Sequence, residues 1–257
     1  MESINISDDN FNELIKRFKI INKQRYVKGV NNNNINSCGI TFEKLIGKNT
    51  DSMFFPDFKD IEIKCKQRFS RYDLNLFTLT FDGPNLFESN YILETYGSND
   101  NMFFNKKELF VNLKYKEKVF VDRKYYFELD SDDEKEMIFV NIYDNDSKLL
   151  EKRCFIFYSS IKNRINVKLR KLALIRASKR KIGFNLYFRY YKISCYELKA
   201  IDNFIDMIKK GVIKLSIVLR FSKSGFEKGK QKNKNMVFSI NQDKIEEIYN
   251  KIYEYEN

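Results

Sequence analysis

Several residue types that build common functional sites are scarce in this chain of 257 residues. It has no histidine and no CxxC pair. Because thiolate and imidazole are the usual ligands of zinc, a zinc site is not expected. Tryptophan is absent and proline occurs only twice, beside abundant asparagine, lysine and isoleucine, a bias typical of an A/T-rich genome. The four cysteines are predicted to be reduced core or surface thiols: Cys38, Cys65, Cys154 and Cys195.

Long hydrophobic runs are missing as well. No stretch approaches the about 20 apolar residues that cross a bilayer. The first ten residues, MESINISDDN, are acidic and polar, unlike a secretory signal peptide. We therefore expect no membrane segment and a cytoplasmic location. Hydrophobic residues make up 43% of the chain, enough for a substantial core in one large domain or two lobes.

Basic residues outnumber acidic ones and give a net charge of +12. A basic surface attracts polyanions by counterion release, which favours a nucleic-acid partner. We predict that the acid-free stretch 162–181 is a basic helix that tracks phosphates, with a solvated helix side plus an exposed turn as an equally weighted alternative. Its cations are Lys162, Arg164, Lys168, Arg170, Lys171, Arg176, Lys179, Arg180 and Lys181.

The segment FPDFKDIEIKCK, residues 55–66, has the pattern of a half-buried strand, because apolar and charged residues alternate from Ile61 onward. Glu62 and Lys64 therefore project from the same face. Asp57 lies in the preceding turn, and a short connection can bring its carboxylate back beside Glu62. The segment thus predicts two neighbouring carboxylates and a lysine.

Two carboxylates so close repel each other unless a cation joins them, and a hard divalent ion such as Mg²⁺ meets that need. Asp57, Glu62 and the backbone carbonyl of Ile63 are the predicted ligands. The metal would activate water, while Lys64 would hold or help deprotonate that water and offset charge on the phosphorane. This pattern predicts phosphodiester hydrolysis. A chance match in an ordinary strand has roughly even odds if the motif is taken alone.

A short helix is predicted just upstream, capped by Thr41 and closed by Gly47. Glu43 lies in its predicted first turn. Taken by itself, Glu43 is a solvated acid that complements the helix dipole. Its place shortly before Asp57 makes it a candidate catalytic carboxylate and metal ligand as well.

At these residues the chain resembles the MvaI/BcnI restriction endonucleases, relatives of the mismatch-repair nickase MutH within the PD-(D/E)xK nuclease superfamily. Residues 211–240 are also similar to that group's recognition region, with a strand ending at Arg220 and a lysine- and glycine-rich loop. The group's HDH triplet is replaced here by Lys232-Asn233-Lys234, and Ser239 stands where an arginine is usual. The catalytic-side matches, in the group's order, are GITFEKLIG at 39–47, PD at 56–57, IEIKCK at 61–66 and LFTLT at 76–80.

The resemblance implies a type II restriction endonuclease that is Mg²⁺-dependent, cuts double-stranded DNA and leaves 5′ phosphates. It implies an α/β fold with a restriction-endonuclease-like mixed sheet, flanking helices and two lobes around a DNA cleft. A monomer on DNA and a cognate DNA methyltransferase follow from the same resemblance. A MutH-like, partner-activated nickase and a basic DNA-binding module without activity are the alternatives.

Seven residues are predicted to contact DNA. A lysine or arginine can donate to O6 and N7 of guanine, and we favour this role for Arg220. Base reading and phosphate gripping are equally weighted for the lysines of the recognition loop. The seven are Lys66, Arg68 and Arg71 after the catalytic strand, and Arg220, Lys230, Lys232 and Lys234 in the recognition region.

We expect a catalytic lobe at 1–105 and a recognition lobe at 106–257, interleaved in space. In the first half of the chain we predict a first helix capped by Ser7 with Phe11, Leu14, Ile15 and Phe18 on one face, a polar loop at Asn31–Asn34, and a strand meander at 109–143 with a charged turn at 130–133. In the second half we predict a strand at 184–191 with Phe184 in the core and then a helix opened by Ser194 and Glu197 that ends near Gly211. A hairpin around Ser224-Gly225 and a final helix carrying Ile245, Ile248 and Ile252 are expected to follow.

Overall fold

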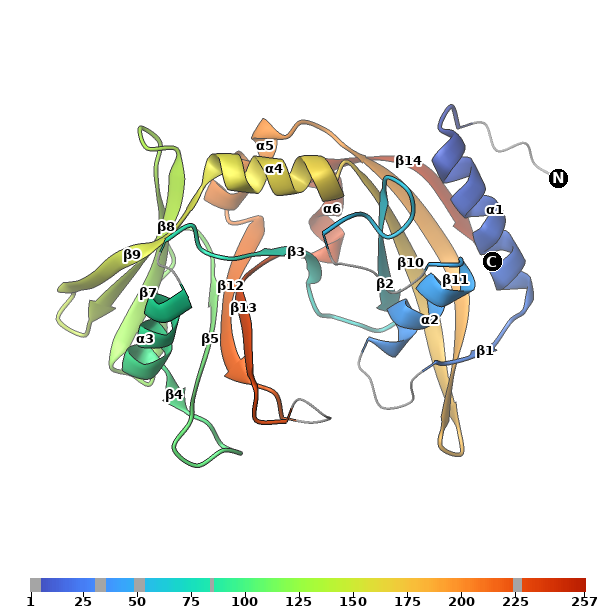
Figure 1. Cartoon of the computed structure of the whole chain (residues 1–257). Helices are drawn as coiled ribbons and strands as arrows, with labels where there is room; N and C mark the ends of the chain where they lie inside the picture. Colours follow the sequence, from blue (N-terminus) through green and yellow to red (C-terminus); the bar gives the residue numbers. More distant parts are fainter. Residues whose placement is uncertain (1–5, 31–35, 49–53, 84–85, 224–227) are drawn as a thin grey trace. The chain divides into compact units, whose positions relative to one another are not determined.

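The structure is a computed structural model that describes residues 6–30, 36–48, 54–83, 86–223 and 228–257 (Figure 1). Unit 1 consists of Met1–Tyr72, Ile165–Ala200 and Glu246–Asn257. Unit 2 consists of Asp73–Arg164 and Ile201–Ile245. These compact units divide the chain differently from the expected lobes, since residue 105 lies inside unit 2. The assignment of catalysis and recognition to separate lobes stays a prediction.

Unit 1 is built on a five-stranded mixed sheet. β2 and β10 pair in parallel, and the other pairs are antiparallel. The parallel pair brings the predicted catalytic strand beside a segment more than a hundred residues later in the chain. The strands are, in order, β1 (Val27–Lys28), β11 (Asn185–Leu198), β10 (Lys171–Ile182) and β2 (Ile61–Gln67), with β14 (Tyr249–Glu256) also paired to β11.

The predicted basic helix over 162–181 was wrong in its second half. α4 (Tyr158–Lys168) ends before Lys171, where β10 begins. The apolar run from Leu172 to Ile175 is fully buried. An unbroken apolar run suits a strand covered on both faces, whereas a surface helix needs a polar side. The basic residues after Ile175 therefore lie on a strand.

One face of the unit 1 sheet is covered by α1 (Asp9–Lys23) and α2 (Ser37–Leu45). The predicted apolar face of α1 is confirmed, because Phe11, Leu14, Ile15 and Phe18 are all 0% exposed. They join a core with Ile61 and Ile63 of β2 and with residues of β10 and β11. This core fixes β2 by its apolar face and leaves the opposite face for its charged residues.

The cap of α1 is Asp8 and not Ser7 as predicted. The Asp8 carboxylate accepts hydrogen bonds from the backbone N–H groups of Asn10 and Phe11, both at 3.0 Å. It also pairs with the ammonium group of Lys171 at the start of β10. A single carboxylate thus satisfies the free N–H groups of the helix and ties the helix to the sheet.

The helix α2 begins at Ser37, so the predicted cap at Thr41 was wrong. The Thr41 hydroxyl lies inside the helix and accepts a hydrogen bond from the Val30 N–H at 3.1 Å. Glu43 consequently lies in the second half of α2 and not in its first turn. The predicted end holds, since Gly47 follows the helix with φ +82°.

Unit 2 contains two antiparallel sheets. The first sheet has five strands in the order β3 (Leu74–Leu79), β13 (Gln231–Ile240), β12 (Ile213–Phe221), β5 (Lys107–Leu113) and β4 (Ser98–Asn99). The second sheet is a meander of four strands that follow one another in the chain: β6 (Val119–Val121), β7 (Tyr125–Asp132), β8 (Met137–Asp144) and β9 (Leu149–Phe157). Its helices include α3 (Leu86–Tyr96), α5 (Asp202–Lys209) and most of α4. The β12–β13 hairpin matches the prediction. The predicted meander at 109–143 was right for β6, β7 and β8 but wrong for its first strand, because β5 pairs with β12 of the other sheet. β7 also extends through the expected turn to Asp132.

Three predictions for the second half of the chain were wrong. Ser194 and Glu197 lie in β11 and do not open a helix. Ile252 lies in β14, because the helical segment is only η1 (Gln242–Lys244) and α6 (Ile245–Ile248). Phe184 is 92% exposed and not in the core. The predicted loop at Asn31–Asn34 and the turn Ser224-Gly225 lie outside the described residues.

Within the described ranges no helix is both long and apolar enough to span a bilayer. The four cysteines are free thiols, three of them buried and Cys65 partly so.

Removing the carboxylate of Asp8 should destabilise unit 1. We expect Asp8→Ala to cost about 1–2 kcal/mol of unfolding free energy, since it removes an N-cap and one partner of Lys171. The neighbouring Asp9 is exposed and makes no side-chain bond in the described structure, so Asp9→Ala is the matched control. Urea denaturation at pH 7 measures both. Equal midpoints for the two variants would contradict the capping role.

Candidate active site

Glu62 and Lys64 lie on the same face of β2, as the alternation predicts. Ile61 and Ile63 belong to the core beneath α1 and α2, so Glu62 and Lys64 point to the other face. On the neighbouring parallel strand Glu62 is in register with Leu172. β2 thus presents Glu62 and Lys64 on one face, and the strand beside it places the apolar residue Leu172 next to Glu62.

Asp57 is brought to β2 by a tight turn. Phe58 and Ile61 exchange backbone hydrogen bonds of 2.9 and 2.8 Å, and Lys59 between them has φ +53°. The Asp57 Oδ2 atom then accepts a hydrogen bond of 3.0 Å from the N–H of Ile63. The turn therefore returns the carboxylate to the strand that carries Glu62.

Lysine ammonium groups balance these carboxylates. Glu62 is 1% exposed; its Oε1 is 2.7 Å from Lys64 Nζ and its Oε2 is 3.4 Å from Lys168 Nζ. Asp57 Oδ1 pairs with the ammonium group of Lys48. Lys48 and Lys168 were not among the predicted site residues. Lys168 belonged to the basic stretch 162–181, predicted either to track phosphates or to be a solvated helix side, and the β2–β10 pairing reveals its proximity to Glu62.

Burial raises the pKa of Glu62, Lys64 lowers it in part, and the charge of Asp57 raises it again. Its Oε2 atom is buried and has no hydrogen-bond partner, although Lys168 is near. A buried carboxylate oxygen without a donor is costly unless a cation compensates it. Glu62 therefore has one oxygen whose coordination can still be completed.

Glu43 belongs to the same cluster of charges. Burial raises the pKa of Glu43, and the nearby charge of Asp57 raises it further, while Lys48, Lys64 and Lys168 act in the opposite direction. Gly39, one turn earlier in α2, leaves room beside it, since a Cβ there would lie 3.8 Å from Glu43 Oε1. Glu43 is thus an electrostatic neighbour of Asp57 and not a solvated first-turn acid.

Carboxylate oxygens are the donors that hard divalent cations prefer, so the chemistry of Asp57, Glu62 and Glu43 fits Mg²⁺. The unpartnered Oε2 of Glu62 fits the same ion. Across the described ranges, no three acidic or cysteine side chains already form a metal cage. The ammonium groups of Lys48, Lys64 and Lys168 lie against the carboxylates of Asp57 and Glu62, so a divalent ion would compete with them for these oxygens. Ile63 lies beside Asp57, and its role as a carbonyl ligand stays a prediction.

The three predicted DNA contacts after the catalytic strand lie at the end of β2 and beyond it. Arg68 and Arg71 are exposed, and the Lys66 ammonium donates to the Tyr72 carbonyl at 3.3 Å. The Arg68 guanidinium lies over the Phe69 ring, 5.6 Å from its centroid. These exposed cations stand on the same unit as the carboxylates.

The four predicted recognition residues belong to unit 2. Arg220 is exposed near the end of β12 and is in register with Lys232 of β13. Lys234 follows on β13, and Lys230 is exposed just before that strand. The structure therefore brings Arg220 and Lys232 together across one hairpin.

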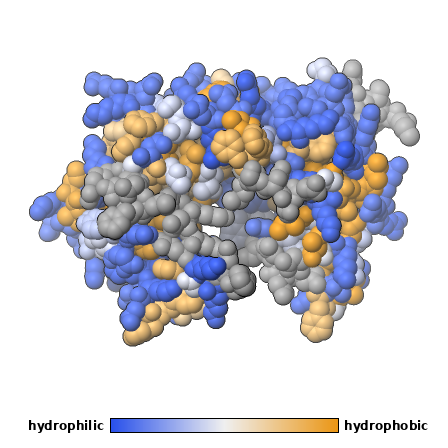
Figure 2. Space-filling view, in the orientation of Figure 1, coloured by the Kyte–Doolittle hydropathy of each residue, from blue (hydrophilic) through white to orange (hydrophobic). Residues whose placement is uncertain are grey.

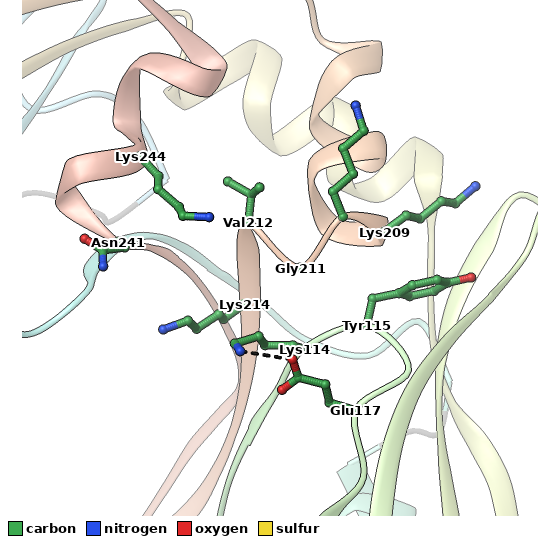
Figure 3. Close-up of a pocket in the computed structure, with 10 residues that line it drawn as sticks. Lys114, Tyr115, Glu117, Lys209, Gly211, Val212, Lys214, Asn241 and Lys244 are labelled. Atoms are coloured by element: carbon green, nitrogen blue, oxygen red, sulfur yellow. Dashed lines mark hydrogen bonds and ion pairs between the residues drawn. The ribbon is translucent and has the colours of Figure 1, made fainter.

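Unit 2 also has a basic pocket of about 400 Å³ that contains none of the predicted site residues (Figure 3). Its lysines are largely paired: Lys114 with Glu117 at 3.0 Å, Lys214 with Asp73 at 2.7 Å, and Lys209 with Asp133. It is lined by Lys114, Tyr115, Glu117, Lys209, Lys210, Gly211, Val212, Lys214, Asn241 and Lys244. The pocket shares no residue with the carboxylate cluster of β2, which forms the candidate active site.

The fold matches solved structures of a restriction endonuclease. The restriction endonuclease MvaI in complex with its cognate DNA substrate matches 96% of this chain and 100% of its own, with a TM-score of 0.87 and 23% sequence identity. MvaI in the absence of DNA matches 98% of both chains, with a TM-score of 0.58 and 23% identity. The chain has the fold of a restriction endonuclease, which confirms the predicted fold class.

A model of the MvaI/BcnI restriction endonuclease family matches residues 15–249. The chain belongs to this family, and the resemblance seen in its motifs is confirmed. No curated protein matches the chain in sequence.

The raised pKa of Glu43 gives a test with a definite sign. Between its ordinary value and its raised folded value, the folded state holds a proton that the unfolded state has lost, so stability falls as pH rises through that window. Glu43→Gln should therefore be more stable than the unmodified protein at pH 7, and the difference should vanish below about pH 4. Urea denaturation across this pH range measures it.

Glu13 provides a control of opposite sign. Hydrogen bonds from Lys59 and Arg17 lower its pKa, so Glu13→Gln should lose stability at pH 7. A pH-independent effect of Glu43→Gln would show that Glu43 is not held in the cluster of charges.

Proposed function

We propose that this protein is a type II restriction endonuclease that hydrolyses phosphodiesters of double-stranded DNA at a specific sequence, requires Mg²⁺ and leaves 5′ phosphates. The observation that carries the proposal is the meeting of Asp57, Glu62 and Lys64 at β2 in a chain of the MvaI/BcnI family. Double-stranded DNA as the substrate is supported by the complex of MvaI with its cognate DNA and by the net charge of +12. We also expect a monomer on DNA and a cognate methyltransferase.

Asp57 and Glu62 would hold Mg²⁺, with Glu43 and the Ile63 carbonyl as further ligands. When bound, this ion neutralises phosphate charge and favours ionisation of water. Lys64 is placed to hold the attacking water and to stabilise the charge that develops on phosphorus. Water adds to phosphorus and the 3′ oxygen leaves, which gives 5′-phosphate and 3′-hydroxyl ends.

Lys48 and Lys168 are positioning residues in this proposal. Lys48 pairs with Asp57, and Lys168 lies 3.4 Å from the second oxygen of Glu62. They reduce the repulsion between the carboxylates while no divalent ion is bound. Since the Lys168 side chain is 10% exposed, its ammonium is held in place beside Glu62.

Loss of a metal-binding carboxylate should stop cutting without removing DNA affinity. We expect Asp57→Asn to lower the cleavage rate more than about a hundred-fold, because metal catalysis supplies several kcal/mol of transition-state stabilisation. Binding of duplex DNA in Ca²⁺ should stay within about three-fold of the unmodified protein. Plasmid cleavage in Mg²⁺ and fluorescence anisotropy in Ca²⁺ measure the two quantities.

Asp60 is a matched control, since it lies in the same turn but pairs with Lys171 at 2.5 Å. Asp60→Asn should cut at the normal rate, and rapid cutting by Asp57→Asn would remove Asp57 from the mechanism.

The plasmid product of the unmodified protein tests the whole proposal. Linear DNA with defined ends supports a type II enzyme, a persistent nicked circle favours a partner-activated nickase, and a gel shift without nicking favours an inactive binding module.

Arg220 is proposed to read a base, and its exposure near the end of β12 permits this. Arg220→Ala should relax the sequence preference at one position of the site, at a cost of about 1–3 kcal/mol there. Cleavage of a library of single-base site variants at two salt concentrations measures the preference. An unchanged preference together with a weaker salt dependence would make Arg220 a phosphate contact.

A further inference from the structure

The long hairpin formed by β10 and β11 ends in an exposed apolar turn. Ile182 is in register with Asn185, so only Gly183 and Phe184 lie between the strands. Gly183 has φ +56°, the conformation that a two-residue hairpin turn of type II′ requires at its first position. Ile182 is 50% exposed and Phe184 92% exposed. Figure 2 shows an apolar patch at the end of this hairpin.

The end of the hairpin extends beyond its neighbours in the sheet. The β2 strand follows β10 only as far as Ala177, whose carbonyl accepts a hydrogen bond from Arg68 N–H at 2.9 Å. On the other side, β1 pairs with Tyr187, and Gly29 donates to the Leu186 carbonyl at 2.7 Å. Residues 178–185, here called the ribbon tip, therefore have no further strand beside them in the described structure (Figure 1).

The ribbon tip carries unbalanced positive charge. Lys179, Arg180 and Lys181 are exposed, and across the hairpin they face Phe188, Tyr187 and Leu186. The sequence has no acidic residue from 152 to 196. Among the described residues, none of the three cations has a carboxylate partner. The tip thus combines three exposed, consecutive cations on β10 with an exposed apolar end.

We propose that the ribbon tip enters a groove of the double-stranded DNA substrate, with Phe184 against the bases and Lys179, Arg180 and Lys181 on the flanking phosphates. The inference rests on the proposed function, since it assigns a further contact to the same substrate. Two-stranded β-ribbons fit DNA grooves, and exposed apolar side chains of minor-groove proteins insert between base steps. The charge of the tip is complementary to this partner.

The dimensions agree with this placement. From Ala177 to Ile182 the strand advances by roughly 16 Å at 3.3 Å per residue. The grooves of B-DNA are about 7.5–8.5 Å deep, so the tip can reach the base edges while the sheet stays outside. A two-stranded ribbon without further support is only marginally stable in water, and a groove would supply the missing contacts.

The ribbon tip is continuous with the predicted DNA contacts of unit 1. The bond between Arg68 and Ala177 joins the base of the tip to the segment that carries Arg68 and Arg71. The tip is nevertheless remote from the candidate catalytic residues. Leu174, the register partner of Lys64, lies eight residues before Ile182, roughly 26 Å along the strand. Changes at the tip should therefore leave the carboxylate cluster intact.

The absence of tryptophan makes the contact directly observable. Phe184→Trp introduces the only indole of the chain at the tip, and stacking on a base should quench its fluorescence and protect it from acrylamide when a duplex of arbitrary sequence is added in EDTA. Ile20→Trp, at a 62% exposed position of α1, is the control and should change little. Unchanged emission and acrylamide access in Phe184→Trp, while anisotropy shows bound DNA, would overturn the proposal.

Affinity measurements test the apolar and the charged parts of the tip separately. In EDTA, Phe184→Ala should weaken duplex binding about ten-fold, the loss of one stacked base. The double variant Lys179→Ser with Lys181→Ser should reduce the slope of log K against log salt by about two. Its control, Lys16→Ser with Lys23→Ser, removes two exposed cations from α1 and should leave slope and affinity unchanged.

These binding tests do not depend on cleavage, so they separate the two proposals. If the protein never cuts DNA but the tip variants lose binding, the proposed function fails and the ribbon contact stands. If the protein cuts DNA and the tip variants bind it normally, the ribbon contact is overturned. Altered oligomeric state in the tip variants without altered DNA binding would also overturn it, because the tip would then join copies of the chain.

Discussion

The buried charge of Glu62 is tolerated only because two lysines reach it from different parts of the chain. The effective cost of burying an unpaired carboxylate is several kcal/mol. Lys64 comes from the same strand, and its ammonium lies 2.7 Å from Glu62. Lys168 comes from the end of α4, whose chain continues into β10, the parallel neighbour of β2. The parallel pairing of these strands therefore determines the electrostatics of the candidate site, and every proposed step of the chemistry depends on it.

Local sequence patterns correctly predicted the helices and strands that depend on residues close together in the sequence. Alternation from Ile61 to Lys66 gave β2 and the shared face of Glu62 and Lys64, and the spacing of apolar residues gave the buried side of α1. The ion pairs of Lys48 and Lys168 could not be foreseen in this way. The turn that returns Asp57 to β2 was expected, but the approach of Lys48 from the end of α2 and of Lys168 from α4 depends on tertiary packing, including a strand pairing over a hundred residues, which no periodicity encodes.

The errors have a common physical origin, since short apolar runs fit a strand or a helix equally well until their neighbours are known. The segment Leu172–Ile175 is a strand because β2 and β11 lie on either side of it. Ile252 is in a strand because β14 pairs with β11. Phe184 follows the alternation of a core strand, but the strand runs past the edge of the core before it turns. Tertiary context decided each case.

Unit 1 is formed by three separate stretches of the chain, which determines when its sheet can fold during synthesis. Its sheet needs β2, β10, β11 and finally β14 at residues 249–256, so the strand that carries Glu62 and Lys64 leaves the ribosome long before its partners are translated. Pairings so distant in sequence form late, and a nascent chain cannot use contacts that have not yet been synthesised. A polypeptide interrupted before residue 171 lacks both the strand beside Glu62 and the rest of the sheet. Translation thus delays assembly of the charged cluster until at least α4 and β10 have been made, long after β2 itself.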